Sequence, residues 1–328
     1  MPFPLPIRPR RNRKSESLRK LLQEHTLSVN DLVMPLFVLN GKNQKTEIPS
    51  MPGLHRYSPD LLVEECKSLF QLGIQAVALF PCIDSPLKDK RATESWNESG
   101  LLAKTIRALK STLPELTVIT DVAMDPYNSD GHDGLVNDRG EVDNDETLPI
   151  LAKMALCQAK SGADIVAPSD MMDGRVRYLR ETLDQAGFHD VGILSYAAKY
   201  ASAFYGPFRD ALNSAPKSGD KKTYQMNPAN LKEALREVAL DIQEGADIVM
   251  VKPGLPYLDV LRAVAEISSV PVAVYNVSGE YAMLKAAALN GWLDAKAAVL
   301  ETLLAFKRAG ASSIFTYHAK EAAEWLGK

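Results

Sequence analysis

Cysteine is scarce in this sequence of 328 residues, which contains only Cys66, Cys82 and Cys157. The three stand singly on apolar segments, without the paired spacing of a zinc site or a disulfide framework. We therefore expect buried, reduced thiols, which fit a reducing compartment.

Long apolar runs and a strong charge excess are also missing. No window approaches the run of about 18 apolar residues that a membrane span needs, and the N-terminus lacks the apolar stretch of a signal peptide. The net charge of −3 gives no general attraction to nucleic acid or to acidic membranes. We expect a cytoplasmic protein with neither membrane nor nucleic acid as a partner.

Residues 1–24 differ in composition from the rest, because prolines alternate with other residues and five basic side chains follow within residues 8–14. Such a segment cannot build a core of its own, so it is either a disordered tail or an arm laid on a partner. Basic arms can bind nucleic acid, but this one offers only Phe3 for stacking. An arm that contacts another subunit is favoured, followed by a single catalytic domain over residues 25–328.

From about residue 31 onward, short apolar runs alternate with helical sequence. The expected strands cover residues 31–39, 76–80, 116–120, 163–167, 191–195, 246–251, 270–275 and 312–316. They read as continuous apolar runs, which is typical of parallel strands covered on both faces. Eight βα units in about 300 residues favour a (β/α)₈ TIM barrel. A doubly wound sheet is the alternative, but no glycine-rich phosphate fingerprint follows the first strand.

Polar residues follow six of these strands, where a barrel places its active site. Lys252 ends the apolar run 248–251 and precedes Pro253 and Gly254, and Lys199 follows the fifth strand. Two amines at one barrel mouth depress each other's pKa, so that one can be neutral near pH 7 and attack a ketone to form an imine. The alternatives are a lysine that snorkels to solvent at position 252 and a charge on a loop helix at position 199.

Two further segments carry charge. The long loop from Lys199 to about Pro228 has the features of a lid, and its cations suit an anionic substrate such as a carboxylate: Arg209, Lys217, Lys221 and Lys222. Residues 121–146 are rich in aspartate, and their oxygen atoms would favour magnesium over zinc if a metal binds there. A solvated loop explains the acidic composition equally well.

Several long stretches resemble the porphobilinogen synthase (5-aminolevulinate dehydratase) family over nearly the whole chain. They are APSDMMDG at 167–174, SYAAKYASAFYGPFRD at 195–210, MVKPG at 250–254, VSGEYAM at 277–283 and FKRAG at 306–310. The resemblance implies a hydro-lyase that condenses two molecules of 5-aminolevulinate to porphobilinogen, with loss of two waters, early in the synthesis of tetrapyrroles such as heme and chlorophyll.

The resemblance also implies residue roles. Lys252 matches the lysine that forms a Schiff base with the first substrate, and Lys199 matches the lysine that binds the second. Ser278 and Tyr317 match groups that hold the first carboxylate, whereas Arg209, Lys221 and Gln225 match lid groups for the second. Lysine at position 221, often arginine in relatives, loses the bidentate fork. The candidate active-site acids and hydroxyl are Asp121, Asp125, Asp133 and Ser169.

One departure from the family concerns metals. Zinc-dependent relatives carry three cysteines where this chain has Ala123, Asp125 and Asp133, so no zinc is expected at the active site. The chain resembles the aspartate-rich, magnesium-stimulated branch, in which Glu237 matches a ligand of an allosteric magnesium. The apolar stripe of residues 231, 235, 238 and 242 directs Glu237 and Asp241 towards solvent or a neighbour. The family is typically homo-octameric, with N-terminal arms that wrap adjacent subunits.

Two other functions compete with this one. A class I aldolase acting on a phosphorylated sugar needs only one imine lysine, and a scaffold that uses its basic arm on an inert barrel needs none. The sequence leaves open whether a metal reaches Asp125 and Asp133, and which of the carbon–carbon and carbon–nitrogen bonds forms first.

Overall fold

Eight parallel strands close a barrel in the computed structural model, which describes residues 5–212 and 216–327. The last strand pairs with the first, through Leu32 with Ile314 and Val33 with Phe315. The predicted TIM barrel is therefore confirmed. The barrel strands are β1 (Leu32–Leu39), β4 (Ala76–Cys82), β5 (Thr117–Val122), β8 (Ile165–Pro168), β9 (Gly192–Lys199), β10 (Ile248–Lys252), β11 (Val272–Asn276) and β12 (Ser313–Thr316).

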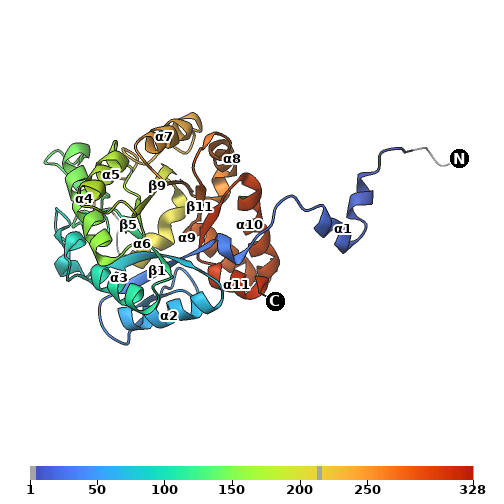
Figure 1. Ribbon diagram of the computed structural model, residues 1–328, viewed down its shortest axis with the longest axis horizontal. Helices are drawn as coiled ribbons and strands as arrows, with labels where there is room; N and C mark the ends of the chain where they lie inside the picture. The colour runs from blue at the N-terminus through green and yellow to red at the C-terminus, as the bar shows by residue number, and fades with distance from the viewer. Residues whose placement is uncertain (1–4, 213–215, 328) are drawn as a thin grey trace.

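Helices connect successive strands and cover the outside of the barrel (Figure 1). Glycines with positive φ end two of the longest helices, Gly162 after α4 and Gly310 after α10, in the left-handed conformation that favours glycine. The α-helices around the barrel are α2 (Pro59–Gln71), α3 (Leu101–Thr112), α4 (Asn144–Ser161), α5 (Arg175–Gln185), α6 (Gly206–Leu212), α7 (Lys232–Gln243), α8 (Leu258–Ile267), α9 (Ser278–Leu289), α10 (Ala295–Ala309) and α11 (Ala319–Leu326).

The core has two parts, separated by the barrel wall. One cluster takes side chains from all eight strands, such as Phe37, Phe80 and Tyr275, and fills the barrel interior. The other lies between strands and helices and contains the alternate residues of the same strands, such as Leu36 and Val38 of β1. The barrel strands are continuous apolar runs in the sequence because both faces of each strand are buried.

Strand β9 is longer than the sequence predicts, because it continues beyond residue 195 to Lys199. Its pairing with β10 shifts on the way: Val249 pairs with Ser195, whereas Val251 pairs with Ala198. One extra residue on β9 forms this bulge, and Ala197 and Ala198 both face the outer core. Beyond the bulge, Lys199 pairs with Lys252 of β10.

The sequence also misses a small extension of the sheet. Strand β3 (His55–Tyr57) pairs with the end of β1, and β2 (Lys45–Glu47) pairs antiparallel with β3. A separate two-stranded ribbon, β6 (Leu135–Val136) with β7 (Val142–Asp143), lies within the acid-rich segment. These strands are too short and too exposed to produce a periodic apolar pattern.

The N-terminal segment projects away from the barrel (Figure 1). It contains the 3₁₀ turn η1 (Pro9–Arg13) and the short helix α1 (Glu16–Leu21), neither of which has a buried residue. The division into an arm of residues 1–24 and a catalytic domain stays a prediction. Among the described residues, no helix is both long enough and apolar enough to span a membrane.

Candidate active site

The carboxyl end of the barrel holds two buried lysines side by side. Lys199 of β9 and Lys252 of β10 are register partners on neighbouring strands, and each is only 6% exposed. Neighbouring register partners in a parallel sheet project from the same face. The structure thus brings together the two amines that the sequence singles out, and neither snorkels to solvent.

Four aromatic rings surround the amine of Lys252. Their centroids lie 4.4 Å (Tyr275), 4.9 Å (Tyr196), 5.2 Å (Phe208) and 5.4 Å (Tyr205) from Nζ. Burial, and then the like charge of Lys199, lower the pKa of Lys252 to about 7. This shift from 10.5 corresponds to about 5 kcal/mol against the charged form. A substantial fraction of Lys252 is therefore a neutral, nucleophilic amine at pH 7.

Lys199 contacts polar groups of the neighbouring loops. Its Nζ donates to the backbone carbonyl of Ser169, the residue that follows β8. It also lies 3.8 Å from a carboxylate oxygen of Asp133. Lys199 is therefore oriented by oxygen atoms, whereas Lys252 is enclosed by rings, so the two amines occupy different environments within one site.

Three buried aspartates with different charge surroundings lie beside the lysines. Burial and the nearby Asp125 carboxylate raise the pKa of Asp121 to about 7. Against the effect of burial, the ammonium groups of Lys199 and Lys221 lower the pKa of Asp133 to about 2. Asp121 can therefore exchange a proton near neutral pH, whereas Asp133 remains a carboxylate.

Lys221 reaches these aspartates from the long loop after β9. Its Nζ lies 3.2 Å from Asp125 and 3.0 Å from Asp133. The Lys221 ammonium thus supplies positive charge between Asp125 and Asp133, the two carboxylates that a metal could otherwise bind. Within the described parts of the chain, no group of three or more His, Cys, Asp or Glu side chains is arranged to hold a metal ion.

The same loop covers Lys252. Its turn η5 (Ala203–Tyr205) and helix α6 rest on the start of α9, where Ser278 Oγ accepts the backbone N–H of Phe208 at 3.0 Å. A Cβ on Gly279 would come within 2.5 Å of the Phe204 carbonyl, so this approach requires glycine. The cavity between Lys252, Phe208, Ser278 and Tyr317 measures only about 10 Å³. The loop therefore encloses Lys252 in this structure, and its movement as a lid stays a prediction.

The remaining predicted substrate ligands lie around this lid. The Tyr317 hydroxyl is 3.1 Å from that of Tyr275. Gln225 is buried and its Oε1 has no hydrogen-bond partner, whereas Arg209 lies half-buried on α6. Lys222 is exposed and pairs with Asp220, as expected of a solvated charge. The structure thus brings the two lysines together with Asp121, Asp125, Asp133 and Lys221, whereas Glu237 lies elsewhere.

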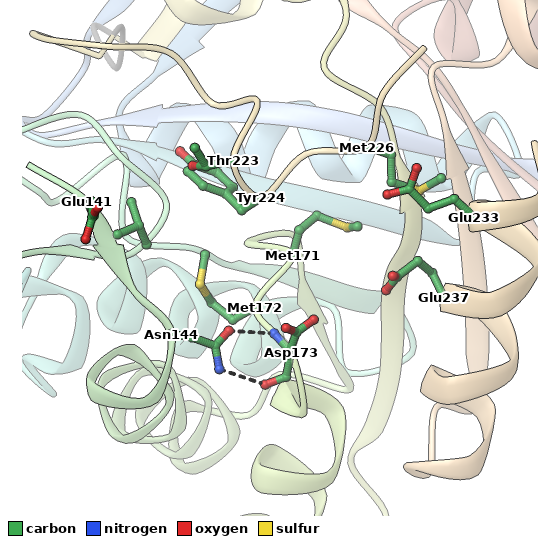
Figure 2. A pocket seen from close by; sticks show the side chains of 11 residues that line it. Glu141, Asn144, Met171, Met172, Asp173, Thr223, Tyr224, Met226, Glu233 and Glu237 are labelled. Carbon is green, nitrogen blue, oxygen red and sulfur yellow. Dashed lines mark hydrogen bonds between the residues drawn. The ribbon is translucent and has the colours of Figure 1, made fainter. Parts of the chain in front are cut away.

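Glu237 lines a separate cavity of about 460 Å³ between α7, residues 171–173 before α5, residues 141–144 and residues 223–226 (Figure 2). Glu233 and Glu237 face this cavity from α7, and Asp173 lies opposite, tied to Asn144 by hydrogen bonds of 2.7 and 3.1 Å (Figure 2). Burial, and then Asp241, raise the pKa of Glu237. The cavity is therefore rich in carboxylates.

The prediction for Asp241 is wrong. Its side chain is buried, lies 3.2 Å from the Arg175 guanidinium and accepts the Ser195 hydroxyl at 2.6 Å. Arg175 is fully buried at the start of α5, so its charge requires a partner from α7. The helical stripe could not reveal this, because the arginine lies 66 residues away in the sequence.

The fold and this site define a (β/α)₈-barrel enzyme whose two buried amines are suited to imine chemistry on carbonyl compounds. The chain belongs to the delta-aminolevulinic acid dehydratase family, whose model matches residues 6–325.

The sequences of relatives in this family are similar to this chain over nearly its full length. The chain is 56% identical to delta-aminolevulinic acid dehydratase of Bradyrhizobium diazoefficiens, over 98% of this chain and 91% of that protein. It is 52% identical to the Synechocystis enzyme over 98% of both chains. The crystal structure of the Toxoplasma gondii enzyme in complex with porphobilinogen superposes with a TM-score of 0.97 at 52% identity, covering 98% of this chain and 92% of that one.

Proposed function

We propose that this enzyme condenses two molecules of 5-aminolevulinate to porphobilinogen with loss of two waters, an early step of tetrapyrrole synthesis. The observation that carries the proposal is the register pair of Lys199 and Lys252 at the carboxyl end of the barrel. Two amines match a reaction that joins two keto acids. An aldolase acting on one ketone would use only one of them.

Lys252 binds the first substrate. Its neutral amine adds to the C4 ketone, and loss of one water gives an imine, which acidifies the neighbouring carbon atoms. The hydroxyls of Ser278 and Tyr317 lie on the same cavity and would hold the substrate carboxylate once the lid releases Ser278.

Lys199 binds the second substrate as a second imine, with loss of the second water. The carboxylate of this substrate binds lid groups from Arg209, Lys221 and Gln225. Lys221 would give up one of its aspartate partners to bind it. The enamine carbon of one substrate adds to the imine carbon of the other substrate. The amino group of that other substrate adds to the imine carbon of the first, and each lysine leaves as a free amine. Asp121, with a pKa of about 7, is suited to move the protons and Ser169 lies beside it in the site.

The direct test supplies the purified protein with 5-aminolevulinate and measures porphobilinogen. Formation of the pyrrole with two substrates consumed per product supports the proposal. Turnover of a phosphorylated sugar aldol without pyrrole formation would instead support the aldolase.

Magnesium is proposed as an allosteric activator held near Glu237. Its support is a cavity lined by four carboxylates, those of Glu141, Asp173, Glu233 and Glu237. They are not gathered into a direct ligand set in this structure and would hold the ion through its water shell. The bound ion would supply positive charge that lowers repulsion among these carboxylates. At the active site the corresponding donors are Asp125 and Asp133 with no cysteine, so no zinc is proposed there.

Adding magnesium to chelator-treated protein is expected to raise both activity and the thermal unfolding midpoint, because an ion bound only to the folded state stabilises it. Glu237→Ala should reduce both responses several-fold, and Glu244→Ala, at the C-terminal cap of α7 and outside the cavity lining, should leave them intact. Activity and stability that are unaffected by chelation and by Glu237→Ala would contradict the site.

The arm is proposed to hold together a homo-oligomer, an octamer as in the family, in the cytoplasm. Its support is the projection of η1 and α1 away from the barrel, with Ile7 and Leu21 about 80% exposed. Deleting residues 1–24 is expected to lower the molar mass measured by light scattering. An unchanged mass would remove this role for the arm.

A further inference from the structure

Glu280 is a fully buried carboxylate near the start of α9 that no step above uses. Its Oε1 accepts the backbone N–H groups of Gly254 at 3.0 Å and Leu255 at 2.7 Å. Its Oε2 accepts Val277 N–H at 2.8 Å and Asn276 Nδ2 at 2.7 Å. The two oxygens thus join the loop directly after Lys252 to the end of β11.

The network continues to the next strand through buried side chains. Thr316 Oγ1 donates to Asn276 Oδ1 at 2.9 Å and accepts the backbone N–H of His318 at 3.2 Å. Asn276 and Thr316 are completely buried. Glu280 is therefore connected to both neighbours of Tyr317 as well as to the residues that follow Lys252 and precede Ser278.

An ordinary helix cap accounts for only part of this arrangement. The bond from Val277 N–H closes a capping turn within α9. The bonds from Gly254, Leu255 and Asn276 lie outside the helix and reach two other strand ends. Buried carboxylates are costly, and one that accepts four N–H groups fixes four donors at once.

We propose that Glu280, acting through Asn276 and Thr316, is a positioning residue that holds Lys252, Ser278 and Tyr317 in the geometry that receives the first substrate. It touches no reacting atom in this arrangement. It makes the ends of β10, β11 and β12 one rigid unit, so that the amine and the two carboxylate-binding hydroxyls keep their spacing when the lid moves. The proposal rests on the proposed function and specifies how one half of that site is held.

The test is a pair of substitutions at Glu280 and Asn276. In Glu280→Gln an NH2 group replaces one carboxylate oxygen and faces N–H donors, so the hydrogen bonds to that oxygen are lost. In the double variant Glu280→Gln with Asn276→Asp, the new amide donates to the new carboxylate, which still accepts from Thr316. The glutamine oxygen can then face Gly254 and Leu255, so that of the four donors only the Val277 N–H loses its acceptor. Glu65→Gln, at a carboxylate that pairs with Lys320 elsewhere, is the control for the chemical change.

The readout is reductive trapping of levulinate on Lys252 with borohydride, followed by mass spectrometry across pH. We expect Glu280→Gln to slow trapping about 10- to 100-fold, as misplacement of a reacting group does, and to move its pH midpoint upward as water reaches the amine. The double variant should recover part of the lost rate, because three of the four hydrogen bonds again have a donor and an acceptor, and Glu65→Gln should match the unsubstituted protein. Porphobilinogen assays should show the KM for 5-aminolevulinate raised along with the loss of kcat.

Trapping at the unsubstituted rate and pH midpoint in Glu280→Gln, with only the thermal midpoint lowered, would overturn the proposal. If that variant does not fold, Thr316→Val removes the branch to β12 alone and should raise KM several-fold with kcat little changed. An unchanged KM in Thr316→Val would equally count against it. Failure of the unsubstituted protein to trap levulinate would overturn the proposed function itself, a distinguishable result.

Discussion

Replacing Lys252 with methionine is expected to abolish porphobilinogen formation, by at least about 10³-fold, or about 4 kcal/mol of transition-state stabilisation. Methionine fills a similar volume among the four rings but has no amine to form the first imine. Borohydride trapping with levulinate should also lose the adduct on the peptide that contains position 252. The measurement is the initial rate, with the adduct mapped by mass spectrometry.

Lys222→Met is the matched control, because Lys222 is exposed on the lid and pairs only with Asp220 in the described structure. Its rate should stay within about twofold, as surface substitutions usually do. In the unsubstituted protein, trapping should fall about tenfold for each pH unit below 7, since the amine must be neutral and its pKa is about 7. Substantial condensation by Lys252→Met would refute the assignment of the nucleophile.

Replacing Lys199 with methionine should reduce condensation by a similar factor of about 10³ but leave the first imine intact. Levulinate should still be trapped on Lys252, because the rings that enclose this amine remain. The pH midpoint for trapping should move above 7, since the like charge of Lys199 is the second cause of the lowered pKa after burial. One experiment that reports both the rate and its pH dependence thus distinguishes the roles of the two lysines.

The outcome that contradicts this assignment is equally defined. If Lys199→Met keeps most of its condensation rate, the second substrate needs neither a covalent bond to position 199 nor a positive charge there. If trapping on Lys252 disappears as well, the substitution has disturbed the first site, and Lys199→Arg, which keeps the charge, then decides between charge and nucleophile.

The barrel was predictable because its strands are buried on both faces and therefore read as uninterrupted apolar runs. Lys252 was predictable for the same reason, since a lysine at the end of such a run must lie at the mouth of the barrel. The end of β9 was not predictable, because the two alanines before Lys199 have little strand preference by themselves. Pairing with β10 and burial of both alanines extend the strand.

The surroundings of the site were less accessible to sequence reasoning. The rings around Lys252 come from positions 196, 205, 208 and 275, and only the folded chain brings them together. Asp241 looked exposed because a helical pattern cannot register a buried arginine on another helix. Glu280 was visible as a polar residue after the seventh strand, but its four donors lie on two segments separated by more than 20 residues.

The bulge in β9 has a consequence for the design of a two-lysine site in another barrel. Tyr196 faces the barrel interior, so strict alternation would direct the side chain of position 199 outward, against the helices. Local lengthening of the strand reverses this orientation and places the second amine next to the first. A designer who grafts a lysine onto a one-lysine barrel must therefore choose the backbone length as well as the residue. The same lysine on an unbulged strand of equal length would give an intact barrel with an amine on the wrong side of its wall.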